Sequence, residues 1–172
     1  MNSRSPANPV LNEIPITSDD VAEINNITLF FFAYRDFTAD ADRKLKEIGF
    51  GRAHHRVLFF VSRKPGMTVA ELLRILGITK QSLARVLRQM VSKGYIIQKP
   101  GNSDRRQRLL FATETGREFV LVLSRMQSKR IAQAIKQSGL ENTEILTQFL
   151  SAMIDPQEFE LMNNLIPLSF RQ

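Results

Sequence analysis

The chain has 172 residues, of which 43% are hydrophobic, and it carries a formal net charge of +7. This length and apolar content suffice for one domain of ordinary size with a buried core. The sequence contains no cysteine, which excludes disulfides, cysteine-ligated zinc and a thiol nucleophile. It also lacks a run of about 18 apolar residues and the apolar core of a signal peptide, so we expect a cytoplasmic protein without a membrane span.

The positive charge is concentrated in the middle third of the chain. Residues 43–108 hold 16 Lys and Arg against 3 Asp and Glu, whereas residues 1–42 are net acidic and residues 109–172 are close to neutral. Solubilising lysines would be scattered rather than segregated in this way. A concentrated basic surface is typical of a protein that binds a polyanion, although a solvated basic face without a partner has the same composition.

The N-terminal part predicts a flexible polar tail over residues 1–17, followed by a helix over residues 18–50. The helix begins near Thr17–Asp20, where N-capping side chains and acidic residues cluster, and ends at Gly49 and Gly51. Three consecutive phenylalanines, Phe30–Phe32, span about 200° of its surface, so one buried face cannot cover them all. We therefore expect one side of this helix to pack on its own domain and the other on a second chain. The expected apolar stripe consists of Ile24, Ile27, Phe31, Tyr34, Ala41, Leu45 and Ile48.

Residues 51–113 predict a winged helix-turn-helix. A helix that buries Ala53, Val57, Leu58 and Val61 is followed by a short helix capped by Thr68 with Glu71 and ended by Gly77. A further helix from Thr79 buries Leu83, Val86, Leu87 and Met90, and two strands over residues 95–100 and 108–113 then flank a basic loop. Residues 114–172 predict a long helix up to Gly139 and shorter amphipathic segments. The expected fold is thus mainly α with a small β-hairpin.

The helix that starts at Thr79 has an apolar face that anchors it and a polar face that is free to enter the major groove of double-stranded DNA. Residues at its N-terminus suit phosphates and base edges, Gln81 suits adenine, Arg85 suits guanine and Arg88 suits a backbone phosphate. The candidate DNA-binding residues of this helix are Thr79, Lys80, Gln81, Ser82, Arg85 and Arg88.

The loop between the two strands supplies the second group of candidates. Arg105, Arg106 and Arg108 suit the minor groove or phosphates. Asp104 would repel DNA, so we expect it to align Arg106 through a salt bridge.

Catalytic chemistry has no support in the sequence. The two histidines, His54 and His55, are adjacent and point about 100° apart on a helix, which makes a poor metal site. We expect one of them to be packed and the other to lie on the surface. No cofactor, no metal and no enzymatic activity are predicted.

Two segments, VAELLRILGITKQSLARVLRQMVSKGYIIQ and SDRRQRLLFATETG, resemble the MarR family of transcriptional regulators. Asp104 and Arg106 match an Asp-x-Arg motif of the wing, and Thr113–Gly116 match the Thr-x-x-Gly that follows it. The stretch GRAHHRVLFFVSRKPG, together with ITKQSLARVL, resembles the PetP-like branch of this family. The resemblance covers roughly Asp20 to Leu165.

The resemblance implies a homodimer whose N- and C-terminal helices interlock and whose two winged domains read a palindromic operator. It also implies a repressor that a small anionic or phenolic effector releases from DNA. Tyr34, Arg35, His54 and His55 are the candidates for lining an effector pocket. The alternative is a winged-helix module that binds proteins without recognising a DNA sequence.

Overall fold

The computed structural model describes residues 17–101, 104–140 and 143–165. The chain divides into two compact units, Met1–Asp36 and Phe37–Gln172. Most of the tail predicted over residues 1–17 lies outside the described residues. Within them, no helix combines the length and the apolarity that crossing a bilayer requires.

Helix α1 (Ser18–Glu47) begins in the first unit and continues into the second. It starts where the sequence predicts, because the Thr17 hydroxyl accepts the backbone N–H of Asp20 at 3.2 Å. In the first unit its large apolar side chains are exposed, among them Ile24, Ile27 and Phe31. In the second unit the same stripe is buried at Ala41 and Leu45.

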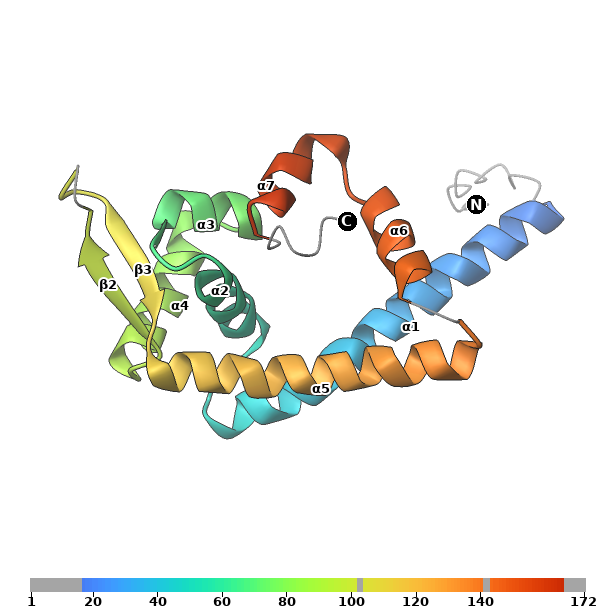
Figure 1. Cartoon of the computed structure of the whole chain (residues 1–172), viewed down its shortest axis with the longest axis horizontal. Coiled ribbons are helices and arrows are strands. Elements are labelled where there is room, and N and C mark those ends of the chain that lie inside the picture. Colours follow the sequence, from blue (N-terminus) through green and yellow to red (C-terminus); the bar gives the residue numbers. More distant parts are fainter. Residues whose placement is uncertain (1–16, 102–103, 141–142, 166–172) are drawn as a thin grey trace, which may run out of the picture. The chain divides into compact units, whose positions relative to one another are not determined.

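Apart from the short strand β1, the second unit has the predicted order of elements. After α1 come α2 (Arg52–Arg63), β1 (Met67–Thr68), α3 (Val69–Leu76), α4 (Lys80–Ser92), β2 (Ile96–Pro100), β3 (Arg108–Ala112), α5 (Glu114–Ser138), α6 (Glu144–Ala152), a 3-10 turn (Pro156–Glu158) and α7 (Phe159–Asn163). Figure 1 shows β2 and β3 side by side as a hairpin, with α5 starting directly after β3.

The sheet has three strands rather than the predicted two. The short strand β1 pairs antiparallel with β3, with Met67 opposite Leu110, so the order is β1-β3-β2. A two-residue strand carries no period-2 pattern of its own, which explains why the sequence alone did not reveal it.

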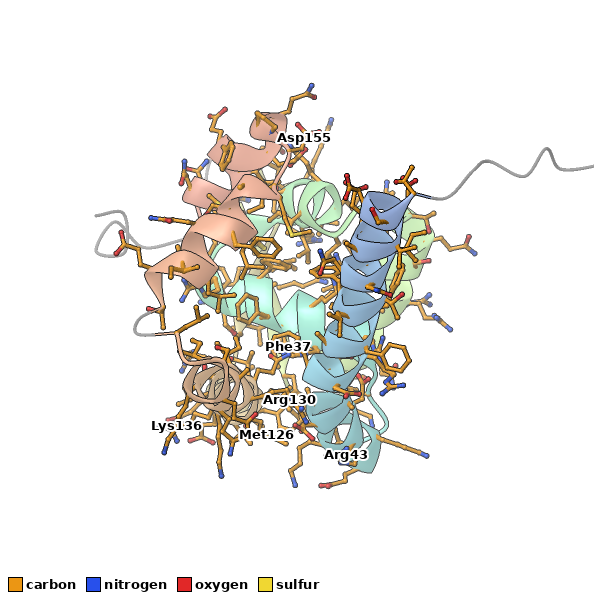
Figure 2. All side chains as sticks on the ribbon, turned by 90° about the vertical axis from the view of Figure 1, so that its right-hand side faces the viewer. Phe37, Arg43, Met126, Arg130, Lys136 and Asp155 are labelled. Carbon is orange, nitrogen blue, oxygen red and sulfur yellow. The ribbon has the colours of Figure 1, made fainter. Side chains whose placement is uncertain are left out.

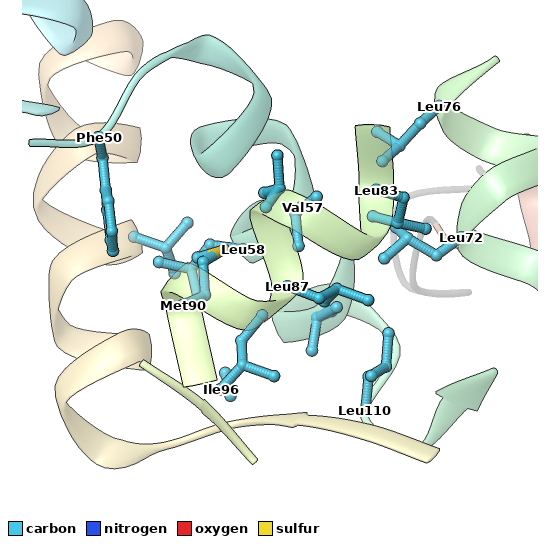
Figure 3. Packing of buried hydrophobic residues seen from close by; sticks show 14 of the residues in the cluster. Phe50, Val57, Leu58, Leu72, Leu76, Leu83, Leu87, Met90, Ile96 and Leu110 are labelled. Carbon is cyan, nitrogen blue, oxygen red and sulfur yellow. The ribbon is translucent and has the colours of Figure 1, made fainter. Parts of the chain in front are cut away.

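The core lies among α2, α3, α4, the sheet and the start of α5. Figure 3 shows Val57 and Leu58 of α2 together with Leu83, Leu87 and Met90 of α4, and all five are buried. The prediction for α2 was wrong at Ala53, which is exposed. Ala53 precedes Val57 by four residues, but the first turn of α2 extends beyond the edge of the core.

The end of α1 is tied to its neighbours by ion pairs. Asp40 accepts Arg130 of α5 at 2.8 Å, and Asp42 accepts Arg52 of α2 at 2.7 Å. The hydrogen bond from Arg130 holds the pKa of Asp40 below its ordinary value. Figure 2 shows Arg130 and Met126 on α5 close to the lower part of α1, and together with these ion pairs it places the end of α1 against α2 and α5.

Candidate nucleic-acid interface

A helix-turn-helix unit is built by α3, a tight turn and α4. The Thr68 hydroxyl accepts the backbone N–H of Glu71 at 3.2 Å, while Glu71 accepts the backbone N–H of Thr68 at 2.7 Å, which is the predicted capping box. Gly77 ends α3 with φ +61°, a left-handed conformation that other residues rarely adopt. The turn therefore depends on glycine at this position.

The two faces of α4 are sharply different. Leu83 and Met90 are fully buried and Val86 and Leu87 are 4% exposed, so one face is anchored in the core. The opposite face is exposed along the helix and consists of Lys80, Gln81, Ser82, Arg85 and Arg88. Hence the candidates of this helix share one solvent-facing surface, which we call the α4 polar face.

The N-terminus of α4 is organised by two hydroxyl groups. The Thr79 hydroxyl accepts the backbone N–H of Ser82 at 3.2 Å and donates to the Ser82 hydroxyl oxygen at 2.9 Å. The Ser82 hydroxyl group can then donate its own hydrogen to an anion, next to the unpaired backbone N–H groups of the first turn. Thr79 thus has a capping role in addition to any contact with a ligand.

The wing consists of β2, β3 and the loop between them, of which Asn102 and Ser103 lie outside the described residues. Ile96 pairs with Ala112 and Pro100 with Arg108. At the loop, a Cβ on Gly101 would lie 2.7 Å from the Asp104 carbonyl oxygen, so the close turn requires glycine. The three arginines of this segment, Arg105, Arg106 and Arg108, are all exposed.

The contact predicted for Asp104 was wrong. Its carboxylate accepts the backbone N–H of Arg106 at 2.9 Å and forms no ion pair with the guanidinium. A short acidic side chain two residues before an N–H closes a local Asx-turn more easily than it reaches a long flexible cation. Asp104 therefore shapes the turn and leaves the Arg106 side chain free to point outward.

The cations of this surface form no ion pairs with other described residues. None of Lys80, Arg85 or Arg88 on α4 forms an ion pair with a described acidic residue, and the same holds for the three wing arginines. Elsewhere in the second unit, cations such as Lys64, Arg52 and Arg130 are paired with carboxylates. The α4 polar face and the wing therefore have positive charge available for an external anion.

Two residues that hold α4 in place were missed by the sequence analysis. Gln89 donates to the carbonyl of Gly49 at 3.0 Å, and its own carbonyl lies 2.8 Å from Nε2 of His54. Lys93 donates to the carbonyl of Ile48 and lies over the Phe50 ring. These bonds join α4 to the loop between α1 and α2, and no local motif marks such long-range contacts.

The α3–α4 turn is held from α2 as well. Arg56 donates to the carbonyl of Leu76 at 3.0 Å, which satisfies a carbonyl group in the last turn of α3. In the sequence Arg56 counted only toward the basic charge of the segment. Its position shows that part of this charge is structural.

The histidines differ from expectation, because neither lies fully on the surface. His54 accepts the backbone N–H of Gly51 on Nδ1 at 3.1 Å and stacks on Phe50. His55 has a buried Nε2 without a hydrogen-bond partner among the described residues, and burial lowers its pKa below the ordinary value. Tyr34 and Arg35 belong to the first unit and the two histidines to the second, so a pocket shared by these four residues stays a prediction.

Comparison with known proteins identifies relatives of the chain. The family model described as MarR family matches residues 48–107. The HTH-type transcriptional regulator PetP of Rhodobacter capsulatus is 45% identical over 130 residues, which cover 76% of this chain and 78% of PetP. The predicted resemblance to PetP is thus confirmed.

Two solved structures share the fold. FabT of Streptococcus pneumoniae in complex with DNA has a TM-score of 0.63 at 18% identity, over 86% of this chain and 100% of that one. The transcriptional repressor CouR bound to a 23-mer DNA duplex has a TM-score of 0.58 at 19% identity, over 80% and 92%. Together with the family model and PetP, these findings confirm the predicted winged-helix fold, and the chain belongs to the MarR family of transcriptional regulators.

Proposed function

We propose that the protein is a sequence-specific regulator that binds double-stranded DNA through the α4 polar face and the wing. MarR-family regulators are DNA-binding proteins rather than enzymes. The observation that carries the proposal is the contrast within α4, whose exposed Gln81 and Arg85 lie opposite a fully buried apolar face. A helix anchored in this way can present base-reading side chains without rearranging the core.

The roles of the residues follow from their chemistry. Gln81 suits adenine and Arg85 suits guanine in the major groove, because each can form two hydrogen bonds to the base edge. Lys80, Ser82 and Arg88 suit phosphates, which position the protein but carry no sequence information. The arginines of the wing suit the minor groove or its phosphates.

We further propose that the protein acts as a homodimer on a palindromic operator. In the first unit the apolar side chains of α1 are exposed, with Phe31 at 69%. In the second unit α6 exposes Ile145, Phe149 and Leu150. Apolar surface of this extent is typical of an interface between chains. Two α4 helices about 34–36 Å apart would then enter successive major grooves.

Repression is the expected mode of regulation, and a small molecule that shifts the spacing of the two α4 helices would release the operator. The CouR structure supports this mode by analogy, since CouR is a repressor bound to DNA. The cytoplasm, where DNA is accessible, is the location expected of such a protein.

Selection of bound fragments from the host genome tests the DNA-binding proposal. We expect a palindromic motif, and we expect the affinity for it to fall steeply with rising salt, because cations released from phosphates contribute to binding. The alternative, a module that binds other proteins, predicts no enrichment of any fragment. A set of bound fragments without a common motif would contradict sequence-specific recognition.

A further inference from the structure

A chain of hydrogen bonds links α4 to the start of α2 and to the loop before it. The backbone N–H of Gly51 donates to Nδ1 of His54 at 3.1 Å, and Nε2 of His54 lies 2.8 Å from the side-chain oxygen of Gln89. The side-chain nitrogen of Gln89 donates in turn to the Gly49 carbonyl at 3.0 Å. We call these three bonds the His54 relay.

The His54 relay fixes which ring nitrogen carries a hydrogen. A backbone N–H can only donate, so Nδ1 of His54 is the acceptor of the bond from Gly51 and carries no hydrogen. Nε2 then carries the one hydrogen of the ring and donates it to Gln89. An imidazole with a hydrogen on each nitrogen could not accept from Gly51. The relay therefore requires the neutral form of the His54 ring.

The position of His54 disfavours a positive charge on its ring. His54 is the third residue of α2, and the dipole at the N-terminus of a helix repels cations. The ring stacks on the buried Phe50, seen at one end of the core cluster in Figure 3, with the two ring centroids 4.6 Å apart. The Lys93 ammonium of α4 lies 5.2 Å from the centre of the same Phe50 ring. A proton on His54 would thus add a second positive charge beside Phe50.

The other titratable groups nearby do not offset this charge. Arg52 of α2 is paired with Asp42 of α1 at 2.7 Å, and Tyr95 packs edge-on against Phe50. The neighbouring His55 has no described hydrogen-bond partner at Nε2. Among the described residues no carboxylate forms an ion pair with the His54 ring. The protonated ring would therefore lack a counter-charge.

We propose that His54 is a positioning residue for α4 and that protonation of its ring weakens DNA binding. The ring acts through Gln89, which directly follows Arg88 of the α4 polar face. Protonation removes the acceptor for the Gly51 N–H, so the ring turns away and Gln89 loses its partner. Side chains that read a ligand must be held to within about 0.5 Å, so a loosened α4 binds its operator less tightly. The inference rests on the proposed function, whose site it regulates.

The direction of the pH dependence separates positioning from simple charge. A proton on His54 adds positive charge, which by itself would strengthen binding to phosphates as the pH falls. Positioning predicts the opposite, namely full affinity while the ring is neutral and a loss of affinity as the ring takes up a proton. Histidine is the side chain whose charge ordinarily changes between about pH 5 and pH 8, so the comparison covers this range.

The first experiment measures the affinity of the full chain for a selected operator fragment by fluorescence anisotropy, at constant ionic strength, from about pH 8 to about pH 5.5. We expect the natural protein to lose affinity about fivefold, the effect of one lost hydrogen bond. His54→Gln, whose amide does not titrate, should show a flat profile. His55→Gln changes the neighbouring histidine and should keep the loss. An affinity that stays constant or rises as the pH falls, or a loss that persists in His54→Gln, would overturn the proposal.

The second experiment needs no DNA and follows the nitrogen-15-labelled full chain by amide NMR over the same pH range. The backbone N–H of Gly51 and the side-chain amide of Gln89 should shift together in the natural protein and stay constant in His54→Gln. Gln89→Met breaks the relay from α4, should also flatten the affinity profile, and decides the outcome if His54→Gln does not fold. Signals that do not shift in the natural protein would overturn the relay. Joint shifts in a protein that binds no operator would uphold the relay and contradict only the proposed function.

Discussion

At Gly116 the first turn of α5 approaches the segment between α4 and β2 so closely that no side chain fits. A Cβ there would lie 2.2 Å from the Tyr95 carbonyl oxygen. That carbonyl also accepts the backbone N–H of Thr113, whose hydroxyl donates to the Gly94 carbonyl and accepts the N–H of Gly116. The Thr-x-x-Gly motif thus fixes the start of α5 against the end of α4, which explains its spacing.

Gly116→Ala should destabilise the protein by roughly 1–3 kcal/mol, because the added methyl group forces the backbone of α5 away from Tyr95. Thr115→Ala changes the neighbouring exposed residue of the same turn and should alter the free energy of unfolding by less than about 0.5 kcal/mol. Urea unfolding of both variants measures the difference. Equal stability of the two variants would contradict the close approach.

Glu71 makes the α2–α3 junction sensitive to acid. The hydrogen bond from the Lys64 ammonium, followed by that from the Thr68 N–H, lowers the pKa of Glu71 below its ordinary value. A carboxyl group whose pKa is lower in the folded state adds stability above its unfolded pKa, and this stability is lost as the pH falls through the folded pKa. Because the group is 40% exposed, the contribution is below about 1 kcal/mol after solvent screening.

Glu71→Gln should therefore be less stable than the natural protein at pH 7, and the gap should narrow below pH 4. Unfolding in urea at several pH values follows the gap. A gap that stays constant down to pH 3 would show that the ionised form of Glu71 does not contribute.

Among the elements, α4 combines two functions on its two faces. Its buried face and the bonds from Gln89 and Lys93 to the loop after α1 fix its orientation, whereas its polar face is left to the solvent. An element that reads DNA needs this rigidity, since its side chains must meet base edges without reorganising the core.

Gln89→Ala should lower the free energy of unfolding by about 1 kcal/mol, since it removes the bonds to Gly49 and His54. Gln81→Ala makes the same change on the exposed side of the same helix and should leave stability within about 0.5 kcal/mol. Thermal or urea unfolding distinguishes them. The assignment of faces would be wrong if Gln81→Ala were the more damaging of the two.

The elements show how far sequence patterns reach. Helix spacing and capping residues located α3, α4 and α5 to within a residue or two, because these signals are local. No local pattern marks the strand β1 or the contacts of Gln89, Lys93 and Arg56, because they depend on residues distant in the chain. The misplaced Ala53 and the Asp104 contact have the same origin, namely three-dimensional context that overrides periodicity and charge.

For the whole molecule, the exposed apolar residues of α1 predict self-association. Phe31→Asp places a charge on the proposed interface and should convert a dimer into a monomer at micromolar concentration in sedimentation velocity. Asn25→Asp adds the same charge at another exposed position of α1 and should keep the dimer. A wild-type protein that sediments as a monomer, or a Phe31→Asp variant that stays dimeric, would contradict the proposed interface.

The central claim is that the polar face of α4 reads a DNA sequence, and the affinity of Arg85→Ala for a selected operator fragment tests it most directly. We expect a loss of roughly 1–3 kcal/mol in binding free energy per half-site and relaxed specificity at one base pair of each half-site, with folding and dimerisation unchanged. Arg125→Ala removes the same charge from α5, away from α4, and should change the affinity far less. If Arg85→Ala bound the same operator with undiminished affinity and specificity, α4 would not be the element that recognises DNA.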